Sequence, residues 1–146
     1  MAGNGRQAGG RKTKDTRDVV RSDGRLGGFD LPDPELYLGP GESWHPATVA
    51  WWDSWRASPQ AVQMMTDPDW HFLLETALIH HNMWGNGRWE FASEVRMRCA
   101  KLGVTPADRK ALKMDVEVPE EYPVGKAKSA DDNVTSIDDR RSRLVG

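Results

Sequence analysis

Residues 68–84, PDWHFLLETALIHHNMW, constrain the fold more than any other part of the chain. They predict a helix of about 17 residues, roughly 25 Å long, with Thr66 or Asp67 as N-cap and Pro68 in the first turn. At about 100° per residue, its apolar side chains fall on two opposite faces. One face carries Trp70, Leu73, Leu74, Ala77, His81 and Trp84, and the other carries Phe72, Ile79 and Met83.

A helix with two apolar faces needs two neighbours. Because the chain has only 146 residues, we expect the second neighbour to be another subunit. The predicted oligomer interface comprises Phe72, Ile79, Met83 and Trp84.

Four more helices are predicted, over residues 46–57, 59–65, 88–102 and 105–113. Pro46 and Pro106 suit first helical turns, and Thr105 suits an N-cap. The Gly-Asn-Gly run at 85–87 is typical of the connection in an αα-hairpin. The predicted fold class is therefore all-α: a compact helical body of about five helices with a central antiparallel αα-hairpin, flanked by disordered N- and C-terminal tails.

Composition divides the chain into four segments. Residues 1–28 hold seven Lys/Arg, three Asp, many glycines and few large apolar side chains, which predicts a disordered basic arm. Proline-rich residues 29–45 predict an extended strap on the surface. Residues 46–114 form the predicted helical core, which carries the expected oligomer interface, and residues 115–146 form a second disordered tail.

No catalytic centre is evident in the sequence. The GRQAGGRKT run at 5–13 lacks the spacing and the preceding strand of a phosphate-binding loop. His80 and His81 would point about 100° apart on a helix, so they do not converge on one metal ion, and His71 with Glu75 lacks a third ligand. Cys99 lies on an apolar helix face and is expected to be an inert buried thiol. We therefore expect no enzyme activity, no cofactor and no bound metal.

The remaining composition points to a protein of the reducing cytoplasm. One cysteine rules out an internal disulfide, and no apolar stretch resembles a signal peptide or a membrane span. All seven tryptophans lie between residues 44 and 89, away from the basic arm. A stacking platform for single-stranded nucleic acid would interleave aromatic and basic residues, so we expect these rings in the core or at an interface.

One stretch of the chain resembles a known family. The motifs are the cluster Trp51-Trp52-x-x-Trp55, the run Ser58-Pro59-Gln60-Ala61, Thr66-Asp67 with Trp70, and Leu102-Gly103-x-Thr105-Pro106-x-Asp108-Arg109. Over residues 30–113 the chain is similar to the small terminase subunit of tailed bacteriophages that infect actinobacteria.

The resemblance implies a function. Small terminases assemble into homo-oligomeric rings in the host cytoplasm, bind double-stranded viral concatemeric DNA at the packaging-initiation site, and hand it to the large terminase subunit, which supplies the ATPase and the nuclease. A non-catalytic helical adaptor that binds no DNA is the alternative, and a metal-dependent nuclease using His71, His80 or His81 is a third hypothesis.

Many small terminases carry an N-terminal helix-turn-helix, which residues 1–28 cannot form. Helices 46–57 and 59–65 could act as a reduced version, but they offer only Arg56 for phosphate contact. We therefore expect DNA to be bound by the basic arm and by the bases around residues 88–113. The candidates are Arg11, Lys12, Lys14, Arg17, Arg21, Arg25, Arg96, Arg98, Lys101, Arg109, Lys110 and Lys113.

Overall fold

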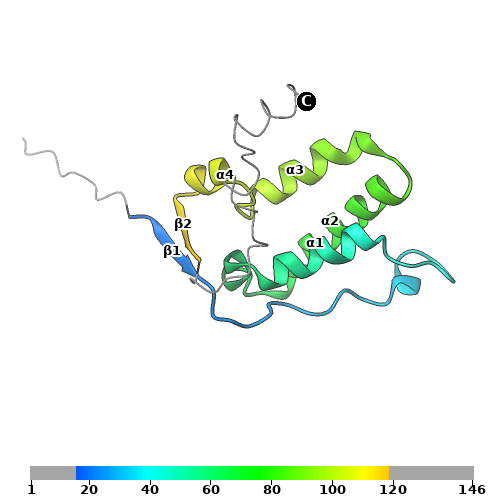
Figure 1. The fold of residues 1–146 in the computed structure, drawn as a ribbon, viewed down its shortest axis with the longest axis horizontal. Helices are drawn as coiled ribbons and strands as arrows, with labels where there is room; N and C mark the ends of the chain where they lie inside the picture. The colour runs from blue at the N-terminus through cyan, green and yellow to red at the C-terminus, as the bar shows by residue number, and fades with distance from the viewer. Residues whose placement is uncertain (1–15, 119–146) are drawn as a thin grey trace, which may run out of the picture.

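The computed structural model describes residues 16–118, which form four α-helices, three 3-10 helices and two strands (Figure 1). The long helices are α1 (Pro46–Ala57), α2 (Asp67–Gly85) and α3 (Ala92–Ala100), followed by the short α4 (Pro106–Ala111). Three short 3-10 helices complete the helical part: η1 (Pro34–Leu36) precedes α1, η2 (Pro59–Gln63) lies between α1 and α2, and η3 (Trp89–Phe91) lies between α2 and α3. The first and the last elements along the chain are the strands β1 (Asp18–Arg21) and β2 (Met114–Glu117).

Helix starts follow the capping chemistry expected from the sequence. The backbone N–H of Thr66 donates to Asp69 Oδ2 over 2.9 Å at the start of α2, which is half of a capping box. Thr105 and Asp108 form the same box at α4, where the Asp108 N–H donates to Thr105 Oγ1 over 3.2 Å. The predicted helix over 68–84 is therefore confirmed with one extra residue at each end.

Three other helices are shorter or tighter than predicted. Residues 59–63 form the 3-10 helix η2, and the predicted helix over 88–102 divides into η3 and α3. The helix predicted over 105–113 is limited to α4. After α4, Lys113 has a positive φ of 55°, which turns the chain out of the helix and into β2.

The core lies between α1 and α2 and is built around tryptophan. Trp52 and Trp70 are buried beside Leu73, Leu74 and Ala77 of α2. Two buried indoles bond to the strap: Trp44 N–H donates to the Pro32 carbonyl over 2.8 Å, and Trp52 N–H donates to the Phe29 carbonyl over 3.1 Å. The indole N–H of Trp70 donates to the Met64 carbonyl over 2.8 Å, within the core itself. The tryptophans thus fix the path of a segment that has little secondary structure of its own.

The second apolar face of α2 is covered partly by the same chain. Met83 is 8% exposed, and Phe72 and Ile79 are half-buried. The guanidinium of Arg98 on α3 lies over the Phe72 ring, 5.4 Å from its centroid, which is within the reach of a cation–π contact. The αα-hairpin thus gives α2 a second neighbour within the same chain, α3. That the second apolar face also meets another subunit stays a prediction.

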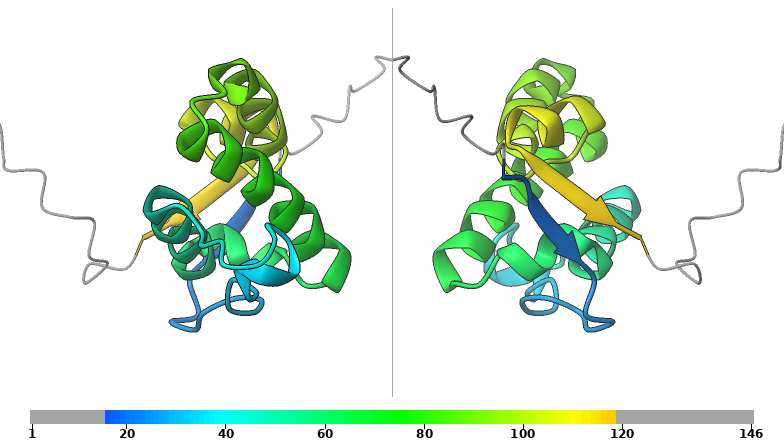
Figure 2. Two further views of the ribbon diagram at one scale, coloured as in Figure 1. Left: turned by 90° about the vertical axis from the view of Figure 1, so that its right-hand side faces the viewer. Right: turned by 90° about the vertical axis from the view of Figure 1, so that its left-hand side faces the viewer.

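The all-α prediction is confirmed for the helical body and wrong in excluding strands. β1 and β2 form a parallel pair in which Asp18 lies opposite Met114 and Arg21 opposite Glu117 (Figure 2). β1 falls in the segment 1–28 that was expected to be disordered, and β2 begins at the last residue of the predicted core and continues into the predicted tail 115–146. Val20 and Met114 point inward and are buried, which gives the pair an apolar side. Four-residue strands nearly 100 residues apart leave no local periodicity to detect, so the sequence did not reveal them.

Candidate nucleic-acid interface

Three exposed cations mark the end of the molecule formed by α3 and α4. Arg96 lies on α3, Lys101 is its C-cap residue, and Lys110 lies in the last turn of α4. All three are exposed, and none forms an ion pair with any residue between 16 and 118. Gly103, with a φ of 75°, turns the chain between the two helices. These side chains are free to contact phosphate.

Two other candidates at this end are engaged in holding the fold. Arg98 Nε donates to Glu94 over 2.7 Å, and Arg98 Nη1 lies 3.4 Å from a Glu75 oxygen on α2. The bond to Glu94 holds the pKa of Arg98 above its ordinary value. Arg109 Nη1 donates to the carbonyls of Gly103 (3.2 Å) and Val104 (3.1 Å). Arg98 ties α3 to α2, and Arg109 closes the α3–α4 turn.

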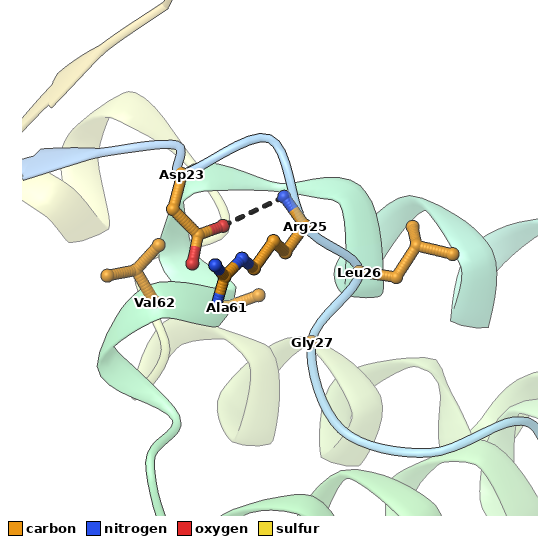
Figure 3. A pocket seen from close by; sticks show the side chains of 6 residues that line it. All are labelled: Asp23, Arg25, Leu26, Gly27, Ala61 and Val62. Carbon is orange, nitrogen blue, oxygen red and sulfur yellow. Dashed lines mark hydrogen bonds between the residues drawn. The ribbon is translucent and has the colours of Figure 1, made fainter.

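The N-terminal candidates divide in the same way. Arg17 pairs with Asp115 at 3.3 Å, and Arg21 makes two bonds to Glu117, of 2.5 and 3.1 Å, so both arginines join β1 to β2. Arg25 lies in a turn where its backbone N–H donates to Asp23 Oδ1 over 2.9 Å (Figure 3). Its guanidinium forms no ion pair within the described residues. Arg11, Lys12 and Lys14 lie outside the part of the chain that the structure describes.

The strand pair brings the N-terminal segment to α4. The Asp18 N–H donates to the Lys113 carbonyl over 3.0 Å, and Lys113 directly follows the last turn of α4. Arg17 is the residue directly before Asp18, so it lies at the same end of the molecule as Lys113, whereas residues 1–15 lie outside the described part of the chain. Two candidate groups more than 80 residues apart in sequence therefore share one end of the molecule.

The predicted interface residues of α2 do not form one exposed surface. Trp84 alone of the four is largely exposed, at 45%. It packs edge-to-face on Trp89, which is 56% exposed, with ring centroids 5.3 Å apart. Trp89 was missed as a surface residue because the sequence placed it inside a long helix, whereas η3 turns it outward. Arg56, passed over as a lone base, is also structural: its Nε donates to the Gly27 carbonyl over 2.9 Å, and it pairs with Asp30.

The histidines are built into the contact between α1 and α2. His80 Nδ1 lies 2.8 Å from the Thr48 hydroxyl, and its ring stacks on Trp51 at 4.9 Å between centroids. Burial, reinforced by His45 and His81, lowers the pKa of His80 to about 4. His81 Nδ1 accepts from the His45 backbone N–H over 3.0 Å, and burial lowers its pKa too. Within the described residues, no group of three His, Cys, Asp or Glu side chains could hold a metal ion.

Fold and site together define a small, mainly helical protein whose unpaired cations gather where a basic N-terminal segment joins the core. A family model described as phage terminase small subunit matches residues 4–145, nearly the whole chain, so the chain belongs to that family and its role lies in phage DNA packaging. No curated protein and no solved structure matches it significantly. Between residues 16 and 118, no helix is both long and apolar enough to cross a membrane.

Proposed function

We propose that this chain is a non-catalytic DNA-recognition subunit. It binds concatemeric viral DNA at the packaging-initiation site in the host cytoplasm and recruits the large terminase, which supplies the ATPase and the nuclease. It acts as a homo-oligomeric ring, in which several basic arms multiply a weak individual contact through their high effective concentration.

The observation that carries this proposal is the hydrogen bond from the Asp18 N–H to the Lys113 carbonyl. It joins the basic N-terminal segment to the core next to α4, where Lys110 is exposed and unpaired within residues 16–118. Phosphate binding depends on Lys and Arg side chains that can release condensed counterions from DNA. An arginine that is paired with a carboxylate must first break that ion pair before it can bind phosphate. Unpaired Lys and Arg side chains therefore contribute more to DNA affinity.

The contacts seen in the structure narrow the twelve candidates. We assign the direct phosphate contacts to the bases that have no ion pair in the described part of the chain and to the bases of the arm. They are Arg25, Arg96, Lys101 and Lys110, together with Arg11, Lys12 and Lys14. Arg17, Arg21, Arg98 and Arg109 instead maintain the framework on which these bases are displayed. Lys113 lies at the junction between the two groups.

Assembly of the ring is proposed to use Trp84 with Trp89. Two exposed indoles in contact form the kind of aromatic anchor that is enriched at protein interfaces. Full-length W84D/W89D protein is expected to lose mass in light scattering while keeping its helical circular dichroism spectrum. An unchanged mass for this variant would show that Trp84 and Trp89 are not part of the ring interface.

DNA binding is tested with charge reversal at the α3–α4 end. Full-length K101E/K110E protein is compared with wild type by fluorescence anisotropy on duplex DNA at several salt concentrations. R88E/E90R is the matched control, because this exposed ion pair lies at the other end of α3. Each lost phosphate contact lowers the slope of log K against log salt by about 0.9. We expect a slope reduced by about 2, with the control unchanged.

Equal affinity and slope for wild type and K101E/K110E would reject these contacts. Absence of DNA binding by the wild type at moderate salt would favour the adaptor hypothesis instead. Recruitment is tested separately, by pull-down of purified large subunit with the full chain in the presence and absence of DNA. Retention of the large subunit is the expected result, and its loss under both conditions contradicts recruitment.

A further inference from the structure

A small apolar pocket lies between α1, η2 and the turn that joins α3 to α4. Its volume is about 140 Å³, and it is lined by Trp51, Ser54, Trp55, Ser58, Gln60 and Val104. The two tryptophans pack edge-to-face, with centroids 6.2 Å apart. None of the bases assigned to DNA contact lines it, so this pocket is separate from the proposed nucleic-acid interface.

The polar side chains of the pocket direct their hydrogens into the protein. The hydroxyls of Ser54 and Ser58 donate to the carbonyls of Trp51 and Trp55, each over 2.7 Å. Gln60 Nε2 donates to the Gly103 carbonyl over 3.1 Å. These three side chains therefore shape the wall, and the donors left for a ligand are the second N–H of Gln60 and the indole N–H groups.

The indole N–H groups of Trp51 and Trp55 have no acceptor among the described residues, unlike those of Trp44, Trp52 and Trp70. No side-chain nitrogen or oxygen in that part of the chain is both fully buried and without a partner. The pocket is thus lined by two indoles whose N–H groups no described residue accepts from. That combination recognises extended proline-containing peptides, whose rings pack on aromatic faces and whose carbonyls accept from indole N–H groups.

We propose that the pocket binds the segment of this chain that directly follows β2, with Pro119 or Pro123 seated against Trp51 and Trp55. β2 ends at Glu117, and the chain continues as Val-Pro-Glu-Glu-Tyr-Pro from residue 118. Of nine prolines in the chain, these two are the only ones outside the described range. Both fall within five residues of its end.

The position of β2 makes this occupant reachable. β2 contacts η2, and η2 contributes Gln60 to the pocket wall. Five extended residues span up to about 17 Å, which is more than the diameter of about 10–12 Å that a helix has with its side chains, so Pro119–Pro123 is long enough to reach across η2. A proline segment loses little conformational entropy on docking, because its backbone is already restricted.

Docking here fixes where the C-terminal segment leaves the core. It would emerge over α1, whereas the basic N-terminal segment joins the core beside α4. The two segments would then be presented on different parts of the surface, free to meet different partners. This inference does not depend on DNA binding.

The test follows the indole N–H signals of the full-length chain by NMR, each assigned with a Trp→Phe variant. Wild type is compared with P119A/P123A, and E120Q/E121Q is the matched control in the same segment. We expect the Trp51 and Trp55 signals to shift in P119A/P123A only, while those of Trp44, Trp52 and Trp70 stay in place. A synthetic peptide of residues 118–126, added to P119A/P123A, should reverse the shift.

Identical Trp51 and Trp55 signals in wild type and P119A/P123A, with no response to the peptide, would overturn the proposal. The shift is also measured over a range of protein concentrations. An intramolecular contact gives the same signals throughout, which is the expected result. A shift that develops with concentration would assign the segment to a second copy and would reject docking within one chain.

Discussion

The backbone of Gly28 lies directly against the indole of Trp70. A Cβ atom at residue 28 would stand 2.3 Å from Trp70 Cδ2, and one at Gly27 would stand 2.6 Å from Trp70 Cζ2. The indole cannot retreat, because it is buried and its N–H donates to the Met64 carbonyl. The absence of side chains at these two positions allows the strap to cross the core tryptophan.

Gly28→Ala is therefore expected to destabilise the protein strongly. Gly24→Ala is the matched control, because both glycines have positive φ, 61° and 73°, while a Cβ at residue 24 meets no atom within 4 Å. The control loses about 1 kcal/mol from the backbone conformation alone, and Gly28→Ala a further 1–3 kcal/mol from overpacking. Urea unfolding measures both. Equal losses would show that the strap can move off Trp70.

The free energy of unfolding is expected to decrease as the pH is lowered, because His80 must stay neutral in the folded protein. Its pKa is about 4 in the folded protein and about 6.5 in the unfolded chain, so between these values the unfolded state binds a proton that the folded state does not. The contribution of neutral His80 to the free energy of unfolding is fully present above pH 6.5. It decreases by about 2 kcal/mol when the pH is lowered from 7 to 5. The lowered pKa of His81 adds to the same trend.

His80→Gln should flatten this dependence, as judged from urea unfolding at pH 7 and pH 5, because the amide does not titrate. His71→Gln is the control for loss of an exposed histidine. If His80→Gln kept the full slope, the proton uptake would have to be assigned to other groups.

Arg96 and Arg98 are expected to separate DNA binding from stability. Both lie on α3, but Arg98 pairs with Glu94 and Glu75 and covers the Phe72 ring, whereas Arg96 is exposed. Arg98→Gln should lower the free energy of unfolding by about 1 kcal/mol with little change in DNA affinity. Arg96→Gln should do the reverse, measured by unfolding and by anisotropy. A loss of DNA affinity in Arg98→Gln, or a loss of stability in Arg96→Gln, would contradict the assignment of Arg98 to the framework and of Arg96 to phosphate contact.

Cys99 is expected to resist thiol reagents in the native protein. Burial, with a smaller contribution from Asp108, raises the pKa of this thiol to about 11. Relative to the ordinary value of 9.0, the thiolate population at a given pH is lower by roughly a hundredfold. Ellman's reagent should therefore label Cys99 slowly in native buffer and at once in denaturant. Rapid stoichiometric labelling of the folded chain would show that the thiol is accessible.

The two strands are expected to depend on their exposed ion pairs. Reversing one charge, in R21E or E117R, should speed amide hydrogen exchange at Val20, because like charges then face each other across the pair. The double variant R21E/E117R restores attraction and should restore protection. R88E is the control, since it breaks an ion pair outside the sheet. Unchanged amide exchange in both single variants would show that the buried side chains of Val20 and Met114, and not the ion pairs, stabilise the strand pair.

Helices could be predicted from the sequence where local chemistry specifies them. Pro46 and the Thr66–Asp69 capping box define helix starts whatever the rest of the chain does, so α1 and α2 were located closely. β1 and β2 were missed because their stability comes from each other across 96 residues. Periodicity in a window of ten or so residues carries no information about such a partner.

The candidate site was predictable only as a set of charges. The sequence identified the bases, but whether a base is free depends on which carboxylate the fold places beside it. Arg98 pairs with Glu94 on its own helix, which the i,i+4 spacing predicts, but its contacts with Glu75 and the Phe72 ring come from another helix and leave no local signal. For α2, the sequence revealed two apolar faces correctly, yet a helix pattern does not state whether its second neighbour belongs to the same chain.

The parallel direction of β1 and β2 has a mechanical consequence. The chain enters β1 at the end nearest Lys113 and leaves β2 at the opposite end, beside Arg21. A pull between the two termini would therefore slide one strand along the other and stretch all of the rungs together, rather than peel them apart one by one. Such a shear geometry suits a protein held at one terminus by its cargo and at the other by a motor.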